Sequence, residues 1–270
     1  DPMDQHCDLK WIRSVVSNSN CRILVGTSME IGRHFSRAAT PQMINATAAN
    51  AYAEGADGFG FISGGSLING WPWNDSTYGT IRVFGNPDLL ATSDKIYRAR
   101  SIAKHPNTPN FSRYPKDGPT DWTPGSEIIL PITLSEGKPV EIPIVISENL
   151  QKPNKEERVE KVELNVRISG LEPDLNDISI QLNNHILPKE FLQLEDLTFR
   201  YMNGDLVAPY GFVYRYRLTS EYYPEIGRNF VTVILNKRDP HIEPPFQIYD
   251  IDLTIKYKPH RNFNSDGLNY

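Results

Sequence analysis

The chain has 270 residues, with 28 Lys or Arg against 33 Asp or Glu, so its formal net charge is -5. This length suits one large or two ordinary domains. The mild acidity argues against nucleic acid as the main partner, because phosphate binding requires concentrated Lys and Arg. No apolar run approaches the roughly 18 residues that a membrane-spanning helix needs.

The first 100 residues alternate between helical and strand patterns. Apolar side chains at Leu9, Ile12, Val15 and Val16 recur at helical spacing and predict a first helix. The short apolar run 22–26 follows it and is rich in the aliphatic residues typical of a strand. Helix and strand signals in this order indicate an α/β part.

A second helix is predicted to begin at Thr40-Pro41 and to end at Gly55. Thr40 is a favoured N-cap residue, and proline is favoured at the first helical position. Gly55 tolerates the left-handed backbone conformation found just after many helices. The apolar run 58–62 comes directly afterwards and predicts a strand covered on both faces. A helix and a buried strand joined by so few residues are typical of an α/β unit.

The next segment, 63–78, contains several Gly and Asn residues and predicts a long loop. Asn86-Pro87 then repeats the cap-and-proline start of a helix. The apolar face of that helix is expected to consist of Leu89, Leu90, Ile96 and Tyr97. Residues 101–122 are a proline-rich linker that cannot form a long helix or an interior strand.

Almost everything after residue 122 has strand patterns. In 162–168, apolar and polar side chains alternate, which indicates antiparallel strands with one buried face. The predicted strands are 127–134, 140–146, 162–168, 178–182, 213–218, 230–235 and 248–257. Asn183-Asn184 and Asn203-Gly204 supply residues favoured in hairpin turns. This region is therefore predicted to form a β-sandwich.

The phrases AYAEGADGFGFISGG at 51–65 and GNPDLLATSDKIYRA at 85–99, followed by a linker and a β-sandwich, carry a resemblance. The chain resembles the C-terminal part of glycoside-hydrolase-like proteins that have a (β/α)8 (TIM) barrel and an appended β-sandwich. This resemblance implies an α/β plus all-β fold, with 22–26 and 58–62 as the seventh and eighth barrel strands. An upstream barrel portion would be required to complete the barrel.

The resemblance also implies a division of the chain into four segments. The expected order is the last strands and helices of a barrel at 1–100, the linker at 101–122, an antiparallel β-sandwich at 123–260 and a tail at 261–270.

The expected activity is hydrolysis of O-glycosyl bonds by a pair of carboxylates. Glu30 is the only carboxylate in 27–37, the loop after the proposed seventh strand, and is the candidate catalytic residue. Its alternative role is a surface ion pair with Arg33 or Arg37. His34 is a candidate for binding a sugar hydroxyl. The acid/base partner of Glu30 would lie on an earlier strand of the barrel.

The loop 63–78 is the second candidate region. Aromatic rings stack on the C–H faces of sugars, and amides and carboxylates hydrogen-bond to hydroxyls. The candidate substrate-binding residues are Asn69, Trp71, Trp73, Asn74, Asp75 and Tyr78. In the alternative interpretation, Trp71 and Trp73 pack against the barrel or the sandwich. The expected partner is an oligo- or polysaccharide, with no metal or cofactor.

A non-catalytic carbohydrate-binding or structural protein remains the alternative function. The many tyrosines of the sandwich either fill and border its core or contact sugar. Sequons at Asn45, Asn74 and Asn110 are candidate glycosylation sites and give weak support for an extracellular or secretory location. Cys7 and Cys21 are either free thiols or a disulfide.

Overall fold

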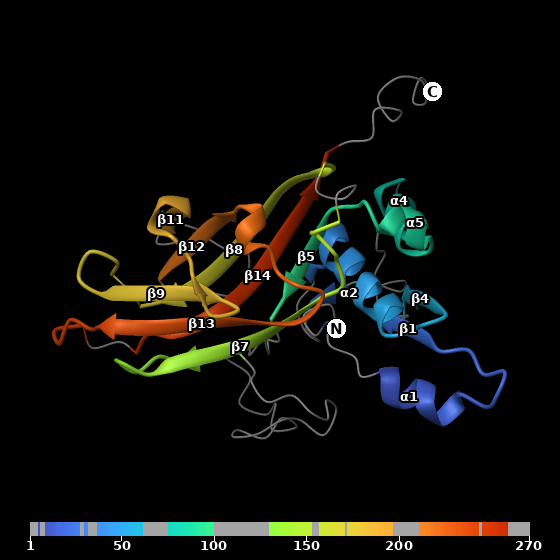
Figure 1. Cartoon of the computed structure of the whole chain (residues 1–270), viewed down its shortest axis with the longest axis horizontal. Helices are drawn as coiled ribbons and strands as arrows, with labels where there is room; N and C mark the ends of the chain where they lie inside the picture. The colour runs from blue at the N-terminus through green and yellow to red at the C-terminus, as the bar shows by residue number, and fades with distance from the viewer. Residues whose placement is uncertain are drawn as a thin grey trace.

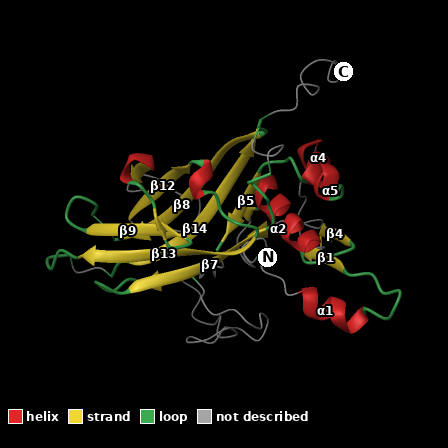
Figure 2. Cartoon of the chain, in the orientation of Figure 1, coloured by secondary structure: helices red, strands yellow, loops and turns green. Residues whose placement is uncertain are grey.

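The structure, a computed structural model, describes residues 5, 9–27, 30–31, 37–61, 75–99, 130–152, 157–170, 172–196, 211–242 and 245–258. In these ranges a mixed α/β part is followed by antiparallel β-sheets (Figures 1 and 2). None of the helices in these ranges is long and apolar enough to cross a membrane.

The α/β part is built around one pair of parallel strands. Its elements are α1 (Leu9–Val16), β1 (Leu24–Thr27), β2 (Glu30–Ile31), β3 (Arg37–Ala38), α2 (Pro41–Ala53), β4 (Gly58–Phe61), α4 (Asp75–Phe84) and α5 (Pro87–Leu90). β1 and β4 pair in parallel, and α2 is the crossover between them. The predicted order of helix, strand, helix and strand is therefore confirmed.

Helix α2 has the ends that its sequence predicts. The Thr40 side chain accepts a hydrogen bond from the Met43 backbone N–H at 3.3 Å, and Gly55 has φ +102°. The helix is buried almost all round because it lies between the parallel pair and the β-sheets (Figure 1). Ala46 belongs to the core of the sheets, whereas Ile44 packs with residues of the α/β part.

Two expectations for the α/β part are wrong. The four residues of β4 are half-buried rather than covered on both faces. The helix beginning at Pro87 ends at Leu90 instead of continuing to Tyr97, and Lys95–Arg98 forms strand β5. A turn closed by the Ser93 N–H on Leu90 O, at 3.2 Å, separates α5 from β5. The helical spacing of Ile96 and Tyr97 is overridden by their pairing with another strand.

In the described residues, two antiparallel sheets follow the α/β part. One has the order β10-β9-β13-β7, and the other has the order β11-β12-β8-β14-β5, with β6 pairing to β14. The strands are β5 (Lys95–Arg98), β6 (Ile132–Thr133), β7 (Pro139–Ile146), β8 (Val159–Ser169), β9 (Asp177–Leu182), β10 (His185–Ile186), β11 (Leu192–Asp196), β12 (Gly211–Leu218), β13 (Gly227–Lys237) and β14 (Gln247–Tyr257). Two short 3-10 helices are η1 (Lys189–Phe191) and η2 (Ser220–Tyr222).

The sheets share one apolar core, which is consistent with the predicted β-sandwich. Ile144 on β7 and Val233 on β13 face the same cluster as Leu164 on β8 and Leu253 on β14. Strand β5 comes directly after the α/β elements in the sequence. It nevertheless belongs to the larger sheet, where it pairs antiparallel with β14. A TIM barrel is not shown, since β1 and β4 form a two-stranded sheet in the described residues.

Most strand predictions after residue 122 are confirmed, although 127–129 lies outside the described residues. Asn183 and Asn184 have φ 50° and 67° and form the turn between β9 and β10, as a two-residue hairpin requires. The second predicted turn, at Asn203-Gly204, is outside the described residues. Sequence reasoning missed the short strands β10 and β11.

Candidate functional site

The carboxyl ends of β1 and β4 lie side by side. Thr27, the last residue of β1, is the registered neighbour of Phe61, the last residue of β4. The chain therefore leaves both strands at the same edge of the parallel pair. In open α/β sheets and barrels, ligands bind at this edge. The two loops selected from the sequence thus begin next to each other.

Glu30 follows Thr27 closely in the chain, and its backbone begins strand β2. The structure pairs Glu30 with Ala38 of β3, so the expected loop 27–37 contains a short antiparallel hairpin. His34 lies outside the described residues.

The second predicted loop does not extend to residue 78. Asp75 and Tyr78 lie within helix α4 rather than in a loop, because helical structure already begins at Asp75. The remaining candidates of this segment lie outside the described residues; they are Asn69, Trp71, Trp73 and Asn74. The structure therefore brings together the starting points of the two predicted loops and leaves their sugar-binding roles as predictions.

An aromatic cluster lies beneath the carboxyl edge. The ring of Phe61 meets the ring of Phe84 edge to face, with centroids 5.0 Å apart, and Phe59 makes a similar contact at 5.3 Å. The Tyr52 hydroxyl donates a hydrogen bond to Phe84 O at 3.1 Å, and burial raises the pKa of Tyr52. These contacts fix the ends of β4 and α4 relative to each other.

The opposite edge of the parallel pair is held by Asp57. Its Oδ2 accepts hydrogen bonds from the Ile23 backbone N–H and from Arg13 Nη2, both at 2.7 Å. The bond from Ile23 and then that from Arg13 lower the pKa of Asp57. Asp57 thus joins the amino ends of both strands to α1.

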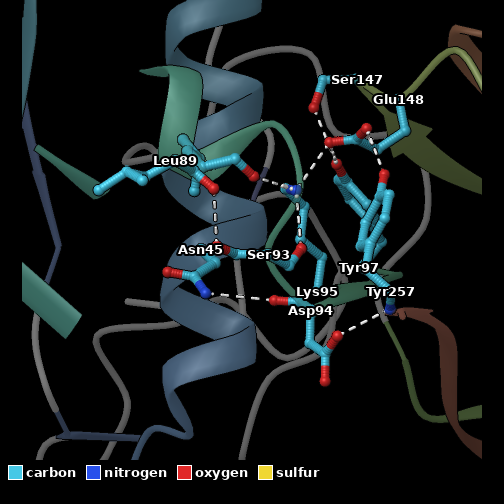
Figure 3. A network of polar contacts seen from close by, with 10 residues as sticks. Asn45, Leu89, Ser93, Asp94, Lys95, Tyr97, Ser147, Glu148 and Tyr257 are labelled. Atoms are coloured by element: carbon cyan, nitrogen blue, oxygen red, sulfur yellow. Dashed lines mark hydrogen bonds and ion pairs between the residues drawn. The ribbon is translucent and has the colours of Figure 1, made fainter. Parts of the chain in front are cut away.

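Polar side chains also form a buried network between the α/β part and the sandwich (Figure 3). Lys95 Nζ lies 2.9 Å from Glu148 Oε1, and these side chains are only 0% and 4% exposed. Lys95 Nζ also donates to the backbone oxygens of Leu90 at 2.5 Å and Ser93 at 3.0 Å. Three oxygens around one ammonium group satisfy its three donors.

Two tyrosines complete the environment of Glu148. The Tyr257 hydroxyl donates to Glu148 Oε2 at 2.8 Å, and the Tyr97 hydroxyl lies 2.9 Å from Ser147 Oγ. Burial, followed by the nearby Glu148 charge, raises the pKa of both tyrosines. The charged groups and hydroxyls of the network therefore bind one another. Their contacts connect β5, the end of α5, β14 and the segment after β7. Sequence reasoning missed this network, because nothing in the sequence around Lys95 indicates its distant partner Glu148.

A row of polar side chains crosses the outer face of the larger sheet. Arg215 Nε donates to Asn165 Oδ1 at 3.1 Å, and Asn165 Nδ2 donates to Asp252 Oδ1 at 2.8 Å. Arg98 is the registered neighbour of Asp252 and makes a close ion pair with Asp250. Burial and then the Asp250 carboxylate raise the pKa of Asp252 to about 6. The ion pair of Arg98 with Asp250 thus ties β5 to β14 of the larger sheet.

The remaining sequence candidates have different surroundings. Asn45 is 6% exposed on α2, and its Nδ2 donates to Asp94 O at 3.2 Å, so the atom that would carry a glycan is engaged inside the fold. Asn74 and Asn110 lie outside the described residues. Cys21 is an exposed free thiol, whereas Cys7 lies outside the described residues.

In the part of the chain that the structure describes, no group of three His, Cys, Asp or Glu residues is placed to hold a metal ion. No protein-family model matches this sequence, and no curated protein is significantly similar to it.

Proposed function

We propose that this chain contributes the last two β/α units of a glycoside-hydrolase-like barrel, together with its β-sandwich, and acts on an oligo- or polysaccharide. The observation that carries the proposal is the shared carboxyl edge, where Thr27 and Phe61 are registered neighbours. In a barrel this edge bears the catalytic loops. Glu30 and the Trp71–Trp73 segment follow these two strand ends in the sequence.

Exposed apolar side chains on α1 and β1 support completion of the α/β part by further β/α units. Trp11 and Val15 on α1 are 67% and 66% exposed, and Leu24 on β1 is 76% exposed. Parallel strands normally have both faces covered by helices. Neighbouring strands and helices of a barrel would cover these side chains and pair with the edge of β1 that has no strand partner in the described residues.

In the proposed reaction, Glu30 is one carboxylate of the catalytic pair. A second carboxylate from an earlier barrel strand would complete it, at about 5–5.5 Å for a retaining enzyme or about 6.5–9.5 Å for an inverting enzyme. One carboxylate attacks the sugar or activates water, while the other protonates the leaving oxygen. The indoles of Trp71 and Trp73 would hold the sugar rings by stacking.

Hydrolysis of a panel of aryl glycosides by the natural protein tests the catalytic role of Glu30. We expect Glu30→Gln to lower kcat by at least about 1000-fold, since it removes a group that reacts or transfers a proton. Retained hydrolysis in that variant would remove Glu30 from the catalytic pair.

Affinity electrophoresis on soluble polysaccharides tests the binding role. We expect Trp71→Ala and Trp73→Ala to weaken retention. Ile186→Ala is the control, because Ile186 is an apolar side chain that is 64% exposed on β10 of the sandwich. Binding that depends on Trp71 and Trp73 without any hydrolysis would favour the alternative, a non-catalytic carbohydrate-binding protein. The absence of both binding and hydrolysis would contradict both functions.

A further inference from the structure

The open side of the sandwich is closed by two side-chain amides. Strand β5 ends the larger sheet and β7 ends the smaller one, so each has one edge without a strand partner in the described residues. Helix α2 packs against both strands. Unpaired strand edges expose N–H and C=O groups that favour pairing with other chains.

Gln5 closes the edge of β5. Ala99 N–H bonds to Ile251 on β14, so the alternation of an antiparallel pair directs Ile96 O and Arg98 N–H to the free edge. Gln5 Nε2 donates to Ile96 O, and Gln5 Oε1 accepts from Arg98 N–H, both at 3.0 Å. One side-chain amide thus makes the two hydrogen bonds that a residue of an adjacent parallel strand would make.

Asn50 closes the edge of β7 and holds Gln5 in place. From α2, its Nδ2 donates to Val145 O at 3.1 Å and to the backbone oxygen of Gln5 at 3.3 Å. Both residues are buried, with Asn50 and Gln5 each 3% exposed. The backbone groups of Pro139 and Pro143 face the same side of β7 as those of Val145, because the three positions differ by even numbers. Proline has no N–H, so these two positions offer no donor at this edge.

We infer that Gln5 and Asn50 act as a surrogate edge strand, a conformational device that joins α2 to both edges of the sandwich. The two residues are coupled, because Asn50 fixes the backbone of Gln5 and Gln5 in turn protects Arg98 N–H. Loss of the Asn50 side chain therefore exposes an amide that Asn50 does not contact. This inference does not depend on the proposed carbohydrate activity.

Residue-resolved hydrogen exchange of the full chain tests the inference. In Gln5→Ala we expect the Arg98 amide to exchange at least about fivefold faster, as the loss of one hydrogen bond predicts. The Ala99 amide, which bonds to Ile251 O, should keep its rate and serves as the internal reference. Asn50→Ala should raise the ratio of Arg98 to Ala99 exchange in the same way.

Asn45→Ala is the matched control. Asn45 is another buried asparagine on α2, but it donates to Asp94 O rather than to Gln5. It should leave the ratio of Arg98 to Ala99 exchange unchanged, even where the variant lowers overall stability. An unchanged ratio in Gln5→Ala would overturn the inference, and so would an unchanged ratio in Asn50→Ala.

Discussion

Lys95 and Glu148 form an ion pair in the interior of the protein, with 2.9 Å between Nζ and Oε1 and both side chains almost fully buried. Lys95 comes from β5, and Glu148 follows β7. The pair therefore joins the edge strands of the two sheets, next to α2. Removal of one partner from such a pair leaves an uncompensated charge in the interior.

We expect Lys95→Met or Glu148→Gln to lower the free energy of unfolding by about 3–5 kcal/mol. The double substitution should cost less than the two single substitutions together, because neither charge is then left alone. Urea denaturation of the four proteins measures this coupling. Lys10→Met is the control, since Lys10 is 78% exposed and lies 3.7 Å from Glu54; it should change stability by less than about 1 kcal/mol. A similarly small effect of Lys95→Met would contradict the prediction.

Asp252→Asn should change how stability depends on pH. The folded protein holds a proton on Asp252 up to about pH 6, whereas the ordinary carboxyl pKa is 3.8. The folded state therefore binds more protons between these values, and the free energy of unfolding falls as pH rises from about 4 to 6. Above about pH 6, the contribution of Asp252 to the free energy of unfolding stays low.

Thermal unfolding from pH 4 to 7.5 measures the effect of Asp252. At pH 7.5 the asparagine variant should be more stable than the wild type by about 3 kcal/mol, because the pKa shift of roughly two units corresponds to about 1.4 kcal/mol per unit. The two proteins should become similar near pH 4. Asp174→Asn, in an exposed turn, is the control and should follow the wild-type profile. If the stability of Asp252→Asn depended on pH in the same way as that of the wild type, Asp252 would not hold this proton.

Asp57→Asn should loosen the amino edge of the parallel pair. The stability that Asp57 contributes is present above its ordinary pKa of 3.8 and is lost as pH falls through its lowered pKa. In the variant we expect faster exchange of the Ile23 amide at neutral pH, since its acceptor loses its charge. Glu54→Gln is the control. An unchanged Ile23 amide would mean that the carboxylate charge is dispensable there.

Gly211→Ala should be poorly tolerated. A Cβ on Gly211 would lie 2.1 Å from Ile168 O and 2.7 Å from the Ser169 Cα, both of which belong to the adjacent strand backbone. Backbone atoms cannot shift cheaply, so we expect a loss of about 3 kcal/mol in the free energy of unfolding. Gly60→Ala is the matched control in β4, where a Cβ would meet nothing within 4 Å. Equal stability of the two variants would contradict this account.

The sequence predicts the elements whose signals are local. Thr40-Pro41 and Gly55 mark the ends of α2, and the Asn183-Asn184 turn marks a hairpin, because caps and turns depend on neighbouring residues alone. The alternation in 162–168 predicts β8 for the same reason.

What the sequence does not predict depends on distant partners. Ile96 and Tyr97 have helical spacing with Leu89, yet they form a strand because β14 lies beside them. Lys95 gives no sign of its partner, since Glu148 reaches it only through folding. At the candidate site, the common edge of the two loops follows from predicted parallel pairing, whereas the helical start of α4 at Asp75 does not.

The pairing of β5 with β14 also affects how the protein is made. Arg98 and Asp250 are 152 positions apart in the chain. At about 5–20 residues per second, a ribosome needs on the order of ten seconds or more to synthesise that interval. During this time β5 has been synthesised but its partner strand β14 has not, so β5 remains without the strand that it pairs with in the folded protein. A nascent chain of this protein is therefore expected to complete its larger sheet only after β14 has been synthesised.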